Sequence, residues 1–372
     1  MYYQAIFKHR HWFITLFIYG VVLTIIYFLV FFIVPRILPE VEFSNTQRQG
    51  IVFRNERWSG EIMVTGDIWA FPGSNVVIMP GTKIVVSNED HFNLHFLPWD
   101  LRSGLNVGKD SFGVRNGELF RDEKNKIQLN FAKIYAIGTR EQPIEIMSKG
   151  SDPPSPYDFN GLTINEGILS FVKISNYRRL SIDDKVTVRD SELVNSGECA
   201  ICIEYNNPTV VNNVFRDNLR SYIWVLGGSP RINDNLFLSS YGDGIVVDPK
   251  IVGAPIVYHN SFEMPNQIVI KLLSGNEEIG GVLAFNDFAG SNKILLPCDS
   301  KIKLIQNQIR GIIEFAESGN CVGNFMIGPN YWFSKDRNAI IKEKIIGKGS
   351  GFNITIPVVL NSPSGNVGRR VQ

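Results

Sequence analysis

Four six-residue segments decide the fold of this chain: VVNNVF at 210–215, INDNLF at 232–237, VYHNSF at 257–262 and LAFNDF at 283–288. In each segment, an asparagine lies three positions after an apolar residue and two positions before a phenylalanine. Two further asparagines have other large apolar residues in the same frame. Together they make a column of six asparagines, one expected in each repeat: Asn213, Asn235, Asn260, Asn286, Asn307 and Asn324. Their intervals of 22, 25, 26, 21 and 17 residues fall in or near the range of solenoids, whose repeats stack because none can bury its apolar face alone.

The segments between the turns predict strands rather than helices, because they are short and rich in Val, Ile, Leu and Phe. Asparagine tolerates the left-handed backbone of tight turns, and identical amides stacked one strand apart can hydrogen-bond along a ladder. We therefore expect an all-β chain folded as a parallel β-helix. It should be right-handed, because parallel crossovers almost always are.

A second column of alternating apolar residues supports this prediction, and its first three pairs share a spacing of 22 residues with the asparagines. The pairs are Ile201 and Ile203, Ile223 and Val225, Ile245 and Val247, Ile268 and Ile270, Ile294 and Leu296, and Ile313 and Phe315. Because side chains alternate along a strand, we expect these pairs to point into the solenoid.

The positions between the inward pairs predict an apolar stripe on the outside: Cys202, Trp224, Val246, Val269 and Leu295, flanked by Tyr222. Soluble surfaces seldom expose such a stripe, so we expect something to cover it. The favoured cover is the chain itself, and the alternatives are a partner, a second copy or a sugar stacked on Trp224. The candidate covering residues are Phe92, Phe96 and Trp99 in one segment, or those around Ile340 and Ile345 in another.

A charge-free run from Trp12 to Pro35, WFITLFIYGVVLTIIYFLVFFIVP, is long enough to cross a bilayer as one helix. It ends in bulky residues rather than a small-residue cleavage site, so it predicts an uncleaved anchor. Lys8 and Arg10 precede it and favour a cytoplasmic N-terminus with an exported body at the cell membrane. The formal net charge of +1 and the scattered basic residues argue against nucleic acid as a partner.

The expected organisation is therefore a cytoplasmic N-terminus at 1–11, an anchor at 12–35, a stalk at 36–57 and a β-helix at 58–332. Residues 88–126 break the strand pattern and form an insertion, a functional loop or a lid. Residues 333–372 form a cap and tail. Within them, FSKDRNAIIKEKIIG at 333–347 predicts a short helix that protects the last strand edge, and FNITIPVVL at 352–360 predicts a final strand.

Several segments resemble right-handed β-helix proteins of the pectin-lyase-like superfamily, especially the bacterial repeat group related to periplasmic copper-maturation proteins. They are WSGEIMVTGDIWAFPGSNVVIMPGTKIVV at 58–86, AKIYAIGTREQPIEIMS at 132–148, FNGLTI at 159–164, PTVVNNVF at 208–215, PRINDNLF at 230–237 and NYWFSKDRNAIIKEKIIG at 330–347. The similarity covers residues 58 to 360 without the insertion. It implies the fold far more than the activity, because this superfold carries lyases, hydrolases, epimerases and adhesins.

The resemblance implies what an enzyme of this superfamily would need: a calcium-binding carboxylate cluster with a base, or paired aspartates flanking a sugar bond. Here the acids lie singly on different turns: Glu204, Asp217, Asp234, Asp243, Asp248 and Asp287. Asp243 and Asp248 could converge with Glu204 on adjacent coils, but solvated turn acids are the default. We therefore expect no catalytic residue.

We also expect no metal and no cofactor. His91 and His95 have a spacing that would align on a helix, with Asp90 and Asp100 nearby, but no helix signal surrounds them. Cys199 and Cys202 form a CxxC, for which an exported location allows a disulfide, with plain solenoid positions favoured. Cys298 and Cys321 lie at inward positions and are most simply small core residues.

The predicted anchor and rigid rod, without a catalytic constellation, indicate a scaffold or binding module at the cell envelope. Its expected partners are the lipid bilayer, through residues 12–35, and a glycan or an envelope protein. Its candidate binding residues are Trp224, Tyr222, Val246, Asp243 and Asp248. The alternative is a polysaccharide lyase or glycoside hydrolase of the pectin-lyase-like superfamily.

Overall fold

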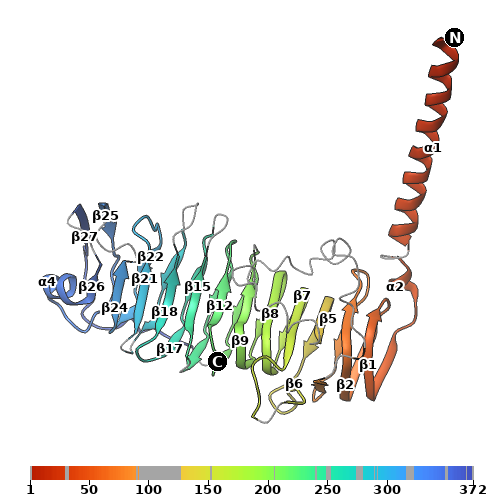
Figure 1. Cartoon of the computed structure of the whole chain (residues 1–372). Coiled ribbons are helices and arrows are strands. Elements are labelled where there is room, and N and C mark those ends of the chain that lie inside the picture. Colours follow the sequence, from red (N-terminus) through yellow and green to blue (C-terminus); the bar gives the residue numbers. More distant parts are fainter. Residues whose placement is uncertain are drawn as a thin grey trace.

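A computed structural model describes residues 2–29, 33–88, 91, 127–150, 153–204, 206–238, 241–248, 253–273, 280–288, 290, 292–315, 322–347, 351–365 and 367–370. In the first helix, α1 (Tyr2–Phe28), side chains are described at Trp12 and from Ile14 onward. Figure 1 shows α1 projecting away from the rest of the chain, to which α2 (Val34–Ile37) connects it. Among the described residues, no helix combines the length and the apolar character needed to cross a membrane.

The chain from Val41 onward is built from parallel strands. The first nine are β1 (Val41–Val52), β2 (Glu56–Ala70), β3 (Val76–Ile78), β4 (Lys83–Val86), β5 (Gln128–Ile137), β6 (Ile144–Ser148), β7 (Phe159–Ser170), β8 (Val172–Arg189) and β9 (Glu192–Ile203). Long members of this set turn corners without a break. For example, β8 pairs with β6 through its first residues and with β10 (Thr209–Val211) through its last.

The following strands are short and come in threes, one triplet for each coil. They are β11 (Val214–Arg216), β12 (Ser221–Val225), β13 (Arg231–Asn233), β14 (Leu236–Leu238), β15 (Asp243–Val247), β16 (Ile256–Tyr258), β17 (Ser261–Glu263), β18 (Ile268–Leu272), β19 (Val282–Ala284), β20 (Asp287–Phe288), β21 (Lys293–Leu296), β22 (Lys303–Ile305), β23 (Gln308–Ile309) and β24 (Ile312–Phe315). Each strand from β10 to β21 pairs in parallel with the strand three places later. The pairing produces three strand columns: the first runs from β10 to β22, the second from β11 to β23 and the third from β12 to β24 (Figure 1). This parallel, solenoid-like sheet is consistent with the predicted β-helix.

The interior is a continuous apolar core. The rings of Phe215, Phe237, Phe262 and Phe288 stack with centroids 4.9, 4.6 and 5.0 Å apart. Five of the six predicted inward pairs are buried as expected, whereas Ile268 is only partly buried. A register shift between Ile268 and Ile270 makes Ile270 and Leu272 the inward pair of β18.

The asparagine ladder lies at the corner between the first and second columns and is fully buried. In each coil the backbone N–H and the side-chain amide both donate to the Oδ1 of the next asparagine; from Asn235 to Asn260 both distances are 3.0 Å. The same Nδ2 also donates to a carbonyl of the preceding coil, as from Asn235 to Val210 O at 3.0 Å. The pattern confirms five predicted members: Asn213, Asn235, Asn260, Asn286 and Asn307.

Two details of the predicted ladder are wrong. Asn324 is exposed and pairs with Asn353, in a separate two-stranded sheet of β25 (Val322–Met326) and β27 (Gly351–Thr355). Asn330 is the next member, since Asn307 donates to its Oδ1 at 2.8 and 3.0 Å. In addition, the left-handed backbone belongs to the residue before each of the five, as at Asn212 with a φ of 55°.

Both ends of the solenoid differ from the predicted boundaries. Residues 41–52 do not form a stalk, because β1 pairs in parallel with β2 from Val41 to Val52, with two register shifts. The predicted terminal helix is present as α4 (Arg337–Ala339) and the π-helical turn η4 (Ile340–Lys344). Ile340 is buried in the core, and β26 (Ile345–Ile346) extends the third column by pairing with β24. This segment therefore closes the end of the stack and does not cover the predicted stripe.

Candidate binding face

The outer surface of the third column presents one continuous row of side chains, which we call the outer row. Strand register places its members directly beside one another: Trp69, Asn130, Thr163, Ser181, Cys202, Trp224, Val246, Lys271, Leu295 and Glu314. The row spans ten coils at about 4.8 Å per step, or about 43 Å in all. Trp69, Cys202 and Val246 are buried within the row. Its partly accessible side chains are Asn130, Thr163, Ser181, Trp224, Lys271, Leu295 and Glu314.

Packing confirms that the middle of this row faces outward. Val246 belongs to no interior cluster although its neighbours Ile245 and Val247 do. Cys199, Cys202 and Leu226 form a second, smaller apolar cluster, against which Trp224 packs. Cys202, Trp224 and Val246 therefore lie on the outside of the solenoid and not in its interior core.

The cysteines differ from the favoured prediction. Cys199 and Cys202 form a disulfide, which confirms the alternative interpretation of the CxxC. Cys298 packs against the core as predicted, although only partly buried, and it is also disulfide-bonded, which was not predicted. Cys321 lies outside the described residues. The centre of the outer row therefore contains a disulfide bond between two buried cysteines.

The predicted apolar stripe is interrupted. The register shift in β18 turns Val269 into the core and puts Lys271 into the outer row, beside Val246 and Leu295. Lys271 Nζ lies 2.8 Å from a carboxylate oxygen of Asp243. The row ends at Glu314, which pairs with Lys293. The C-terminal part of the row is therefore charged and paired.

Tyr222, predicted to flank the stripe, is fully buried. Its ring packs against those of Phe215 and Phe237 at 5.8 and 5.7 Å, and its hydroxyl donates to the carbonyl of Leu238. Tyr222 is therefore a core residue, and its assignment to a binding surface is wrong.

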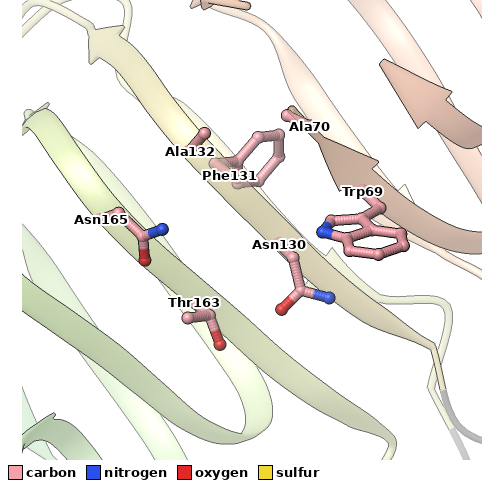
Figure 2. A pocket seen from close by; sticks show the side chains of 7 residues that line it. All are labelled: Trp69, Ala70, Asn130, Phe131, Ala132, Thr163 and Asn165. Atoms are coloured by element: carbon pink, nitrogen blue, oxygen red, sulfur yellow. The ribbon is translucent and has the colours of Figure 1, made fainter. Parts of the chain in front are cut away.

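A hollow lies at the N-terminal end of the outer row, where polar side chains replace apolar ones (Figure 2). It is small, with a cavity volume of about 10 Å³, which is room for about one water molecule. The lining residues come from β2, β5 and β7: Trp69, Ala70, Asn130, Phe131, Ala132, Thr163 and Asn165. Figure 2 shows Trp69, Asn130 and Thr163 on three neighbouring strands.

Two polar side chains of this hollow, Thr163 and Asn130, have hydrogen-bonding capacity that is not used within the described residues. Gln128 Nε2 donates to Thr163 Oγ1 at 3.2 Å, which leaves the Thr163 hydroxyl proton to donate elsewhere. The Oδ1 atom of Asn130 is buried and has no hydrogen-bond partner among the described residues. Buried acceptors in proteins nearly always have a donor, so this oxygen is an exception in the wall of the hollow.

A buried ion pair stiffens the sheet next to the row. Arg178 Nη2 lies 2.6 Å from Glu198 Oε1, and Arg179 Nη1 lies 3.6 Å from Glu198 Oε2. Both members of the closer pair are almost inaccessible to solvent, and removing one partner would strand a buried charge. This pair therefore belongs to the structural support of the face.

The predicted acids do not converge. Asp243 begins β15 and Asp248 follows its end, so about 16 Å of strand separates them. Leu226 occupies the coil between Glu204 and Asp248. Among the described residues, no three His, Cys, Asp or Glu side chains come close enough to hold a metal ion. His91 is described and exposed, while His95, Asp90 and Asp100 lie outside the described residues, as do Phe92, Phe96 and Trp99.

Comparison of the chain with known protein families, curated proteins and solved structures finds no match. The resemblance to the pectin-lyase-like superfamily therefore stays a prediction. The sequence prediction missed the polar half of the outer row. Its signal was the alternation in QLNF at 128–131 and GLTI at 161–164, which places Asn130 between inward Leu129 and Phe131 and Thr163 between inward Leu162 and Ile164.

Proposed function

We propose that this protein is a membrane-anchored, extracytoplasmic binding module that holds a glycan chain along the outer row. The observation that carries the proposal is the row itself, with its hollow beside Trp69. Within the proposal, the fold is a right-handed β-helix of the pectin-lyase-like kind, and Trp224, Val246, Asp243 and Asp248 lie on or beside the binding face.

The chemistry of the row suits sugars. Indole rings offer flat apolar surfaces with a polar edge, and sugar rings present flat apolar faces to such surfaces. Trp224 is the partly accessible indole of the row, whereas Trp69 is 7% exposed and its ring stacks on Phe71. Asn130 and Thr163 supply an acceptor and a donor between these rings, as orienting groups do in small-ligand sites. The rigid repeat of the coils would present such groups at regular intervals to a polymer.

The anchor is supported by the sequence, in which the charge-free run from Trp12 to Pro35 extends beyond the described side chains of α1. The described apolar side chains of this helix are exposed, including Trp12 at 69% and Phe17 at 73%. The Cys199–Cys202 disulfide supports export, because disulfides persist in oxidising compartments. Protease added to intact cells should remove the chain after residue 50, and complete protection would reverse this topology.

The binding test uses the full-length protein in lipid nanodiscs and a panel of immobilised neutral and acidic polysaccharides. Retention on at least one polysaccharide should fall at least tenfold in Asn130→Ala and in Trp224→Ser. Ile256→Ser is the matched control, because Ile256 is similarly placed on the outside of the first column. Its retention should equal that of the unmodified protein.

The same incubation separates binding from cleavage. Release of unsaturated or reducing ends, lost on changing Asp243 or Asp248, would favour the lyase or hydrolase alternative. Failure of every polysaccharide to retain a folded protein would refute the glycan proposal.

A further inference from the structure

The C-terminal segment docks on the corner that carries the asparagine ladder. The docking surface is the row of left-handed residues that precede the ladder positions, which we call the corner row: Asp190, Asn212, Asp234, His259, Phe285 and Gln306. Asn212 Nδ2 donates to Asp190 Oδ1 at 2.6 Å, and the rings of His259 and Phe285 stack at 5.0 Å. The corner row is therefore an ordered surface with its own contacts.

Three consecutive residues of the tail bind this surface. Gly368 N donates to the carbonyl of Phe285 at 2.8 Å, and Arg369 N donates to Ser261 Oγ at 2.8 Å. The Arg369 guanidinium donates to Asn212 Oδ1 at 3.1 and 2.8 Å and to Asn212 O at 3.4 Å. The Arg370 guanidinium holds both oxygens of Asp234, at 2.8 and 2.9 Å.

The charges of the corner row match those of the docked segment. The carboxylates of Asp190 and Asp234 both attract the Arg369 guanidinium. The two-pronged contact of Arg370 with Asp234 has a planar geometry that a lysine cannot reproduce. The surface thus distinguishes a pair of arginines from other basic residues.

The connection to this docked segment is loosely held. Before it, Leu360 N donates to the carbonyl of Asn330 at 3.0 Å. The residues that follow are exposed at Asn361, Ser362, Pro363 and Gly365. Segments with few buried contacts open first, while the body of the fold stays intact. The tether only raises the local concentration of the docked residues, so a second segment of the same chemistry can compete with it.

We propose that the corner row is a binding site for an extended peptide with two consecutive arginines, and that the chain's own Gly368–Arg370 fills it in this structure. Opening of the tail would expose the site to the same segment of a second copy of this chain. The proposal is independent of what the outer row binds, because the two surfaces lie on different sides of the coil.

The test uses the full-length protein in nanodiscs with Arg369→Ala and Arg370→Ala combined in one variant, which we call the disarmed variant. It removes both arginines of the tail and leaves the corner row unchanged. A fluorescent peptide of residues 361–372 should bind this variant at least tenfold more tightly than it binds the unmodified protein, whose own tail competes. Adding Asp234→Asn to the variant should weaken binding at least tenfold. Asp217→Asn is the matched control, since Asp217 is also left-handed but exposed at another corner, and it should change binding less than twofold.

A peptide with both arginines changed to lysine should bind at least fivefold more weakly. A disarmed variant that keeps the wild-type circular dichroism spectrum and fails to bind the peptide would overturn the proposal, as would binding that ignores Asp234→Asn. Amide hydrogen exchange provides a second measurement on the unmodified protein. Excess free peptide should speed exchange at Gly368 and Arg369, and unchanged exchange at saturating peptide would also refute a releasable tail.

Discussion

The two halves of the solenoid turn their corners differently. In the N-terminal half, from β2 to β9, long strands continue through the corners, and β8 alone has 18 residues. In the C-terminal half, from β10 to β24, strands have two to five residues, and a left-handed residue and a ladder asparagine separate the first column from the second. We call them the wrapped half and the ladder half.

The difference shows two physical solutions to one geometric problem. The wrapped half relies on backbone irregularity: β7 shifts register between Ile164 and Glu166, and Gly167 has a φ of 142°. A Cβ on Gly167 would lie 1.8 Å from the carbonyl oxygen of Ile134, so only glycine fits there. The ladder half instead uses side-chain amides that satisfy the corner's buried backbone groups. Its stability should therefore depend on a few identical residues.

The largest effect tests the shared interior. Ile245→Asp places an unpaired charge among apolar neighbours of both adjacent coils, Ile223 and Ile270, and should lower the free energy of unfolding by about 4 kcal/mol. Denaturant unfolding of the full-length protein measures this loss. The control Ile256→Asp changes an exposed position of the first column and should cost less than about 0.5 kcal/mol. A variant at Ile245 that unfolds like the unmodified protein would refute the inward register.

The next effect tests the ladder. Asn260→Ala removes the acceptor of both Asn235 donors and the donor to the carbonyl of Ile232. Each stranded buried group costs about 1–3 kcal/mol, and we expect about 3 kcal/mol in denaturant unfolding. Ser148→Ala is the control in the wrapped half, where Ser148 Oγ donates one partly buried bond to Asp158 Oδ2 at 3.0 Å. Equal losses at both sites would remove the proposed distinction between the halves.

The disulfide lies where the two halves meet, because β9 ends the wrapped half and pairs with β12 of the ladder half. Cys199→Ala with Cys202→Ala frees a four-residue loop, for which chain entropy predicts a loss of about 2 kcal/mol. The midpoint of denaturant unfolding should fall accordingly, and reduction of the unmodified protein should reproduce the shift. A larger loss from reduction than from substitution would point to Cys298, which is also disulfide-bonded.

The contrast between the halves also explains what the sequence could predict. Repeated side-chain chemistry is visible in a sequence, so the ladder and its strands were predictable from Asn213 to Asn307. Asn330 carries the same frame, with Ile327 three positions before it and Trp332 two positions after it. Asn324 fits the same frame, with Cys321 three positions before it and Met326 two positions after it, so only strand pairing distinguishes Asn324 from Asn330.

Backbone irregularities leave a weaker trace. The register shift in β18 puts Lys271 rather than Val269 into the outer row. Alternation alone cannot locate such a shift. The same holds for β1, whose pairing with β2 is irregular at two places and which was predicted to be a stalk. The polar half of the outer row was missed because Trp69 and Asn130 are neighbours across the sheet but lie 61 residues apart in the sequence.

The smallest effect concerns the contact between the ladder half and its own tail. Burial by itself raises the pKa of Asp234, but hydrogen bonds from Arg370 and Asn233 outweigh burial and hold this pKa below its ordinary value of 3.8. A carboxyl group with a lowered pKa stabilises the folded state above its ordinary pKa, and this contribution disappears as the pH falls through the folded-state value. Arg369 and Arg370, the charged groups of the docked tail, stay protonated in that range.

We therefore expect the melting temperature of the unmodified protein to exceed that of Asp234→Asn by a constant amount between pH 7 and 5. The gap should shrink below about pH 4, because protonated Asp234 no longer holds Arg370 as an ion pair. Arg370→Ala should show the same convergence, since it removes the other partner, while Asp217→Asn should follow the unmodified protein throughout. A gap that persists unchanged to pH 2 would mean that Asp234 stabilises its corner through the Asn233 contact and the backbone turn rather than through the tail.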